Sequence, residues 1–326
     1  MNFPQELPVD GGVVRADGID VPVTNLDKVF WPDEQITKGD LLTYYFNVAP
    51  AILPYLRDRP LTLKRYPNGI DARYFFQKDA PDYTPRWVEL CAIEPEDTKI
   101  DETVMVNKLA DILFVANLGC IEMHPLHSRC ERYDFPDYMV VDLDPMEPAT
   151  FADAAIIAHH VRAIFDVLGL VGYVKTSGAT GIQIYVPVEE KHSYDETRGL
   201  SEEIGLAIVK ADPSRATMEW DVAKRSGKVF IDHKMNRRAA SLSAAYSVRP
   251  EPGATVSTPL RWDELFDVTP QDFTIGTVFD RIAAGDPFEN VLRKRQSLDE
   301  ALDKLGVQAS REDISEGRVR KRVRRG

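Results

Sequence analysis

The segment Pro136–Pro145, with the sequence PDYMVVDLDP, limits the possible folds more than any other part of the chain. Its apolar residues are bounded by proline at both ends and predict a buried β-strand, yet the strand closes with Asp142 and Asp144. Residues two apart on a strand face the same way, so the two carboxylates repel each other unless a positive group lies between them. The pair is therefore either a solvated strand end or one side of a divalent-metal site.

Length and composition indicate a globular protein. The 326 residues suffice for one large or two ordinary domains, and a hydrophobic content of 44% supports a sizeable core. No apolar run approaches the roughly 18 residues that a membrane span requires. The three cysteines are too few and too unevenly spaced for a disulfide framework, and the N-terminus has no features of a secretion signal. We therefore expect a soluble protein of the reducing cytoplasm, with no membrane partner.

The formal net charge of −12 argues at first against nucleic acid as a partner. However, the acids crowd into stretches such as 89–102 and 189–203, whereas Lys and Arg gather in short blocks that could line one groove. Because an enzyme that binds metal must also carry acids in its site, the sum of charges does not exclude a nucleic-acid substrate.

The N-terminal part begins with a predicted hairpin. Two short strands in 13–23 surround Asp17-Gly18, a pair that suits a tight turn, and an amphipathic helix is predicted from Thr37 to Leu53. Lys28 and Lys38 are both expected at helix starts, where their charge adds to the positive end of the helix dipole and would bind an anion. The alternative is two solvated lysines.

Adjacent aromatic residues follow in the segment Arg59–Gln77. A strand and a Pro-Asn-Gly turn lead to Phe75 and Phe76, which should point to opposite faces of a strand, so at least one of them is not part of a core. Basic residues surround the pair, namely Lys64, Arg65, Arg73 and Lys78. This mixture suits base stacking beside phosphate contacts, although a strand that crosses the edge of the core would look the same.

A helix is predicted over Thr103–Gly119, and a run of possible metal ligands follows it. Cys120, His124, His127 and Cys130 invite comparison with a zinc knuckle. The spacing matches no common structural zinc module, so zinc is disfavoured.

Beyond the opening strand, helix 150–168 and strand 171–176 lead to a loop of small residues, Ser177–Gly181. Such a loop lets backbone N–H groups and a Ser hydroxyl approach a triphosphate, although a plain hairpin turn would have the same composition. A helix is predicted at 194–211, and a short apolar strand then ends in Asp232. A third carboxylate favours metal, because three carboxylates suit two divalent ions that bridge a triphosphate.

The C-terminal part closes the molecule with a helix predicted at 279–284. From 296 the chain is charged and weakly apolar and ends in a basic run, so 296–326 is expected to be a disordered cationic tail that attracts phosphates, after a catalytic domain at 1–295.

Four motifs in this order resemble the polymerase domain of the bacterial ligase D family, in the archaeo-eukaryotic primase superfamily. They read DLDP, SGATGIQIYVP, FIDHKMN and AYSVRP, and the resemblance runs from about residue 26 to 288. It implies an α/β fold, with two mixed β-sheets flanked by helices and a catalytic groove between them. It also implies a DNA-dependent primase-polymerase that adds nucleotides, with ribonucleotides preferred, to a primer 3′-OH at gaps or broken ends during DNA repair.

The resemblance also implies a role for each candidate residue. The metal-binding catalytic acids are Asp142, Asp144 and Asp232, with two Mn²⁺ or Mg²⁺ ions; the nucleotide-binding residues are His124, Ser177, Gly178, Gln183 and Arg249; Lys28 and Lys38 hold a DNA 5′-phosphate; and Phe75 and Phe76 stack at the DNA.

Two positions depart from the family pattern. The family usually has His where Gln183 stands and often a basic residue near Thr180, and an amide donates a hydrogen bond but carries no charge. Two other functions therefore stay open, a noncatalytic DNA-end binding module and a metal-dependent phosphodiesterase. The sequence shows no ligase or nuclease domain, so we expect a stand-alone polymerase at the nucleoid that works with a separate DNA ligase and a Ku-like end-binding protein.

Overall fold

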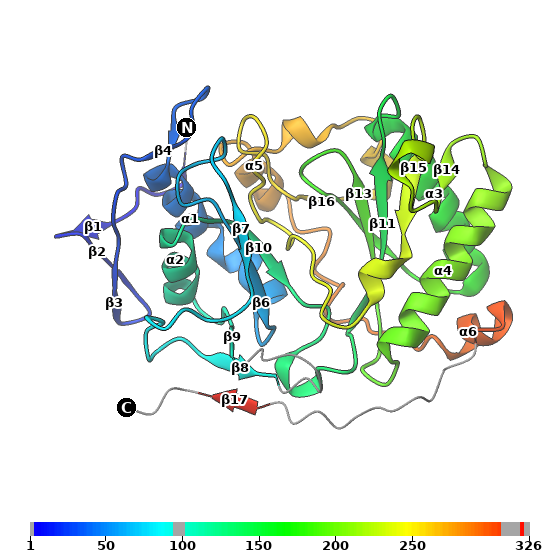
Figure 1. The fold of residues 1–326 in the computed structure, drawn as a ribbon, viewed down its shortest axis with the longest axis horizontal. Coiled ribbons are helices and arrows are strands. Elements are labelled where there is room, and N and C mark those ends of the chain that lie inside the picture. Colours follow the sequence, from blue (N-terminus) through cyan, green and yellow to red (C-terminus); the bar gives the residue numbers. More distant parts are fainter. Residues whose placement is uncertain (1–2, 94–101, 308–319, 323–326) are drawn as a thin grey trace.

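The structure is a computed structural model that describes residues 3–93, 102–307 and 320–322. Two layered regions lie side by side in Figure 1. One contains α1, α2 and a three-stranded sheet, and the other contains a six-stranded sheet with α3 and α4 outside it. The α/β class predicted from the sequence is confirmed.

The six-stranded sheet carries the first motif and runs in the order β14-β15-β11-β13-β12-β16. Only β14 and β15 pair in parallel, and all other neighbours are antiparallel. The bounds are β11 Tyr138–Pro145, β12 Tyr173–Thr176, β13 Ile182–Pro187, β14 Ala216–Thr217, β15 Val229–Asp232 and β16 Pro259–Leu260.

Alternation along β11 decides which side chains meet the helices. Met139, Val141 and Leu143 pack in one core with helices α3, Phe151–Leu168, and α4, Tyr194–Ala211. Successive side chains of a strand point to opposite faces, so Asp142 and Asp144 face away from that core. The sheet face that carries the acids is therefore turned toward the three-stranded sheet.

The three-stranded sheet is antiparallel and has the order β10-β6-β7, with β6 at Leu61–Arg65, β7 at Phe75–Gln77 and β10 at Cys120–Pro125. Helices α1, Lys38–Leu56, and α2, Leu109–Asn117, contribute to the same hydrophobic core as β6 and β10. Thr37 caps α1 through a reciprocal bond with Asp40, as Ser or Thr does in a capping box.

The predicted N-terminal hairpin is confirmed. Strands β2, Val13–Ala16, and β3, Ile19–Pro22, pair around Asp17 and Gly18, whose φ angles are +51° and +76°. Two positive φ values are what a two-residue primed turn requires. The other short elements are β1 Val9–Asp10, β4 Val29–Trp31, β5 Ile36–Thr37, β8 Leu90–Ala92, β9 Thr103–Val104, α5 Val278–Ala283, α6 Asp299–Leu305 and β17 Arg320–Arg322.

Three sequence-based predictions about local structure are wrong. The helix predicted from Thr103 begins only at Leu109, because Thr103 and Val104 pair with β8. Lys28 does not start a helix, since it follows a turn and precedes β4. The predicted disordered tail contains α6, because Leu298, Ala301 and Leu302 are buried in the core beside α3 and α4. The rest of that segment lies mostly outside the described residues.

The cysteines also differ from expectation. Cys91 and Cys130 form a disulfide across 39 residues of sequence, and Cys120 is a buried free thiol. The fold brings β8 next to the short helix at Cys130–Arg132, a contact that spacing alone does not reveal. The cysteine-based reason for expecting a reducing compartment is therefore lost. Within the described residues, no helix has the length and apolar character that a membrane span needs.

Candidate active site

A row of four polar residues crosses the middle of the six-stranded sheet. In the pairing register, Asp142 of β11 lies opposite Asp232 of β15 on one side and Gln183 of β13 on the other. Gln183 in turn lies opposite Lys175 of β12. All four side chains are buried, and they share the sheet face that is turned away from α3 and α4. The fold therefore brings together three of the predicted site residues, Asp142, Asp232 and Gln183.

Burial raises the pKa of all three acids, and repulsion between carboxylates adds to this for Asp142 and Asp144. Burial raises the pKa of Asp142 well above its usual value, and the charges of Asp144 and Asp232 add to this, whereas a hydrogen bond from Gln183 opposes it. Burial and the charge of Asp232 raise the pKa of Asp144 to about 6. Burial also raises the pKa of Asp232. Oδ1 of Asp142 is buried and accepts no hydrogen bond. The cluster holds more negative charge than its surroundings compensate.

The Ser177–Gly181 loop is folded tightly beside these acids. Oγ of Ser177 accepts hydrogen bonds from the backbone N–H of Ala179 at 3.2 Å and of Gly181 at 3.0 Å. A Cβ on Gly181 would lie 3.0 Å from Oδ1 of Asp144, and a Cβ on Gly178 would lie 2.7 Å from Cγ of Arg249. Because Gly178 and Gly181 have no side chains, the loop can lie directly against both Asp144 and Arg249.

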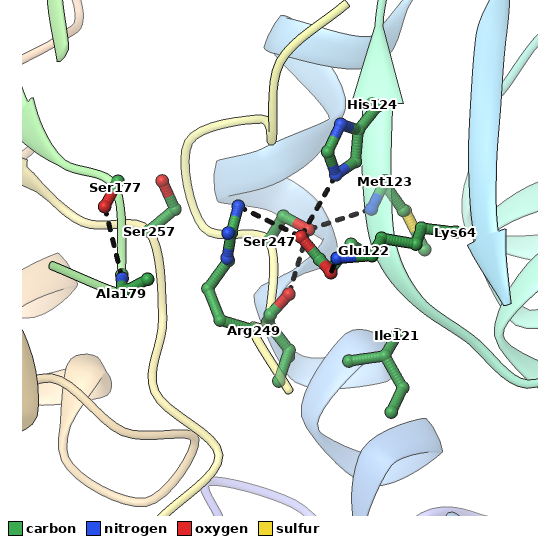
Figure 2. Close-up of polar contacts among 12 residues, drawn as sticks. Lys64, Ile121, Glu122, Met123, His124, Ser177, Ala179, Ser247, Arg249 and Ser257 are labelled. Carbon is green, nitrogen blue, oxygen red and sulfur yellow. Dashed lines mark hydrogen bonds and ion pairs between the residues drawn. The ribbon is translucent and has the colours of Figure 1, made fainter. Parts of the chain in front are cut away.

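A buried carboxylate, Glu122 of β10, organises the cations on the other side of Arg249. Figure 2 shows Arg249 and His124 directed at Glu122, with Nη1 of Arg249 at 3.0 Å and Nε2 of His124 at 3.1 Å from Oε2. Nζ of Lys64 lies 2.5 Å from Oε1. Burial alone would raise the pKa of Glu122, but the bond from His124 and the charges of Arg249 and Lys64 outweigh it and hold the pKa at about 2. Glu122 stays ionised and holds three basic side chains in place.

The exposed aromatic residues adjoin this cluster. Phe75 and Phe76 are 43% and 55% exposed, so neither belongs to the core. Each lies near a cation of the neighbouring strand: Cζ of Arg65 is 5.2 Å from the centre of the Phe75 ring, and Nζ of Lys64 is 5.7 Å from that of Phe76. The ring of Phe76 also contacts His124 edge-on. The aromatic surface and the basic cluster are therefore continuous.

The two predicted lysines line one pocket of about 240 Å³. Nζ of Lys28 donates to the carbonyl oxygen of Pro67 at 2.6 Å, and Nζ of Lys38 donates to that of Thr24 at 2.7 Å. Burial and the charge of Lys28 lower the pKa of Lys38 to about 8. Arg65 lines the same pocket, which thus connects through Arg65 to Phe75. The lining contains three cations and no carboxylate, a composition that suits an anion.

Comparison with known proteins decides the family. The family model described as "LigD, primase-polymerase domain" matches residues 37–288. The chain belongs to this family. The polymerase domain of Mycobacterium tuberculosis ligase D, solved in complex with DNA, has a similar structure, with 30% identity and a TM-score of 0.78. The match covers 85% of this chain and 99% of that domain.

Curated LigD relatives agree. The chain is 32% identical over 297 residues to the multifunctional non-homologous end joining protein LigD of Mycolicibacterium smegmatis, and 33% identical over 286 residues to the bifunctional LigD of Bacillus subtilis. The matches cover 90% and 86% of this chain but 38% and 45% of those proteins. The chain thus spans less than half the length of these LigD proteins and corresponds to their primase-polymerase part.

Two residues of this site were not predicted from the sequence. Glu122 and Lys175 do not belong to the four motifs, and only the fold shows that they meet them. Lys175 is fully buried and donates a hydrogen bond to Oγ of Ser257. Burial and the charge of Arg249 lower its pKa well below the usual value, while the charge of Asp142 opposes this. Its position two residues before Ser177, at the end of an apolar strand, was the available signal.

The structure also bears on the metal predictions. Among the described residues, no three His, Cys, Asp or Glu side chains are arranged closely enough in this structure to hold an ion. The zinc site considered for Cys120, His124, His127 and Cys130 is not formed, because the sulfur of Cys130 is bonded to Cys91. Ion binding by the three acids is taken up below as a proposal.

Proposed function

We propose that this protein is a metal-dependent primase-polymerase that adds nucleotides to a primer 3′-OH at gaps or broken DNA ends. The observation that carries the proposal is the common location of three features. The three acids, the Ser177–Gly181 loop and the cluster around Glu122 adjoin one another, each being linked to the next through Asp144 or Arg249. Membership of the LigD primase-polymerase family supports the same reaction class.

The acids suit divalent ions. Asp142, Asp144 and Asp232 are buried together, have raised pKa values and leave Oδ1 of Asp142 without a partner, which is the electrostatic situation that a cation relieves. Oxygen ligands of this kind favour Mg²⁺ or Mn²⁺. When bound, two such ions would activate the primer 3′-OH and neutralise charge on the leaving pyrophosphate. Gln183 lies opposite Asp142 in the strand pairing, and its amide lowers the pKa of that carboxylate against the effect of burial.

The residues beside the acids suit the nucleotide. Arg249 faces the loop on one side and Glu122 on the other, and its Nε is buried without a partner, so a donor is available for a phosphate oxygen. His124 lies beside it on the same carboxylate. These side chains are held before the substrate arrives, and such preorganised hydrogen-bond donors stabilise charge that develops on a triphosphate.

The remaining features suit the DNA. The pocket of Lys28, Lys38 and Arg65 would take the 5′-phosphate at the far side of a gap, and Phe75 and Phe76 would stack on the adjoining bases. We further propose that the nucleotides added are preferably ribonucleotides, as the family resemblance implies. A separate DNA ligase and a Ku-like end-binding protein would complete the repair at the nucleoid.

Primer extension with Mn²⁺ and labelled ribonucleotides tests the proposal on gapped, overhanging and unprimed templates. The wild-type protein should lengthen the primer, and Asp142→Asn should not, although it should bind the gapped DNA as well as the wild type does. Binding without extension by the wild type would instead support a DNA-end binding module. A shortened primer would support a metal-dependent phosphodiesterase.

A further inference from the structure

An exposed tryptophan lies beside the acids, on the side away from Phe75 and Phe76. Trp220 follows β14 in the segment that leads to β15, and it is 46% exposed. In Figure 1, β14 and β15 lie on the side of β11 that is away from β7. Phe230 of β15 pairs in register with Asp144, and the Trp220 ring contacts Phe230 edge-on, with 5.3 Å between ring centres. The indole therefore contacts Phe230, the residue that pairs with Asp144 of the acid cluster.

Two cations accompany this ring. Nζ of Lys234 lies 3.8 Å from the centre of the Trp220 ring, and Cζ of Arg225 lies 5.6 Å from it and 3.6 Å from that of Phe230. Arg225 is fixed by hydrogen bonds to the carbonyl oxygens of Glu219 at 2.6 Å and Trp220 at 2.8 Å.

The Trp220 ring packs edge-on against Phe230 and His233, yet 46% of the residue stays exposed. Its indole N–H meets no hydrogen-bond partner within the described part of the chain, and it belongs to none of the hydrophobic cores. A large exposed ring with an unused donor and adjacent cations has the composition of sites that stack an unpaired nucleobase and attract its phosphates. A double-stranded segment would offer no free base face to such a ring.

We propose that Trp220, with Lys234 and Arg225, is a stacking site for an unpaired base of single-stranded nucleic acid, distinct from Phe75 and Phe76. The proposal rests on the proposed function only in that both require nucleic acid at the acids. A strand that passes the acids would then be held on both sides. A base held at Trp220 would limit where the single-stranded part of an overhang can lie relative to Asp144 and Asp232.

Tryptophan fluorescence tests this site directly. The chain has four tryptophans, and among the described residues only Trp220 is an exposed one. Titration with a short oligodeoxythymidine, in EDTA and without nucleotide, should quench the emission of the wild-type protein. In Trp220→Phe the quenching should be lost while most of the affinity remains, because phenylalanine still offers a ring. In Trp220→Ala the dissociation constant should rise about 5- to 150-fold, the range that corresponds to loss of one base–aromatic stack.

Two controls separate stacking from other effects. An oligonucleotide of the same length with abasic sites should bind wild type and Trp220→Ala alike, since it offers phosphates but no bases. Phe266→Ala removes another exposed ring, 60% exposed and stacked on His159, and should leave the affinity unchanged. Equal affinity of Trp220→Ala and wild type for oligodeoxythymidine would overturn the proposal, and so would an equal loss for the abasic strand. Because no metal or nucleotide is present, a failure of primer extension would not affect the result.

Discussion

Replacing Glu122 by glutamine tests whether one buried carboxylate organises the basic side of the site. Gln keeps the size of the side chain but removes the charge, so Lys64, His124 and Arg249 lose their common partner. The side chain of Glu122 is 0% exposed, and those of its three partners are 12–18% exposed, so solvent screens these interactions weakly.

The expected loss follows from the pKa of Glu122, which is lowered from 4.5 to about 2. At 1.36 kcal/mol per tenfold change in proton affinity, this corresponds to about 3 kcal/mol of stability. The folded pKa lies below the unfolded one, so this contribution is complete above about pH 4.5 and is lost as the pH falls toward 2. The difference between the two proteins should therefore shrink with acidification.

Urea unfolding of wild type and Glu122→Gln at pH 7, 5 and 3.5 measures this difference. The variant should unfold at a lower midpoint at pH 7, by about 3 kcal/mol, and the gap should narrow at pH 3.5. Glu264→Gln, which breaks an ion pair with the single cation Arg281, is the matched control and should cost less. The reasoning is refuted if Glu122→Gln stays within about 0.5 kcal/mol of wild type at pH 7, a typical surface effect, or if the gap does not depend on pH.

Three further substitutions examine other parts of the site. Gly178→Ala should weaken nucleotide binding, measured by calorimetry, and should lower the melting temperature more than Gly169→Ala does. Both glycines have positive φ, but only Gly178 has neighbours within 4 Å of an added Cβ. Lys38 should lose charge above about pH 8, so the preference for 5′-phosphorylated gaps should fall between pH 7 and 9 in wild type but persist in Lys38→Arg; gap-binding titrations follow it. Gln183→Met should raise the Mn²⁺ concentration for half-maximal extension about tenfold or more, because Asp142 loses a donor; an unchanged requirement would contradict this.

Local patterns predicted the parts of the fold that depend on neighbours in sequence. The alternation of β11 placed Asp142 and Asp144 on one face, and the Asp17-Gly18 pair predicted the first hairpin. The helix predicted from Thr103 starts later than expected, because Thr103 and Val104 pair with β8 instead. No local sequence pattern shows this pairing.

The basic cluster could not be predicted for a similar reason. Glu122 lies in an ordinary-looking strand, and two of its three partners, Lys64 and Arg249, are 58 and 127 positions away in sequence. The disulfide between Cys91 and Cys130 likewise depends on two segments that meet only in the folded chain. Residue types at single positions suggested the chemistry, whereas the partners of each side chain came from the tertiary structure.

The row formed by Asp232, Asp142, Gln183 and Lys175 has a consequence for how this chain tolerates insertions and deletions. The row crosses four strands, and the same register that aligns it turns the apolar residues of those strands toward α3 and α4. Adding or removing one residue within any of these strands would turn its polar member into the core and its apolar neighbours outward. Insertions and deletions should therefore accumulate in the connecting loops. Within these strands, any change of length that disrupts the polar row also disrupts the packing against α3 and α4.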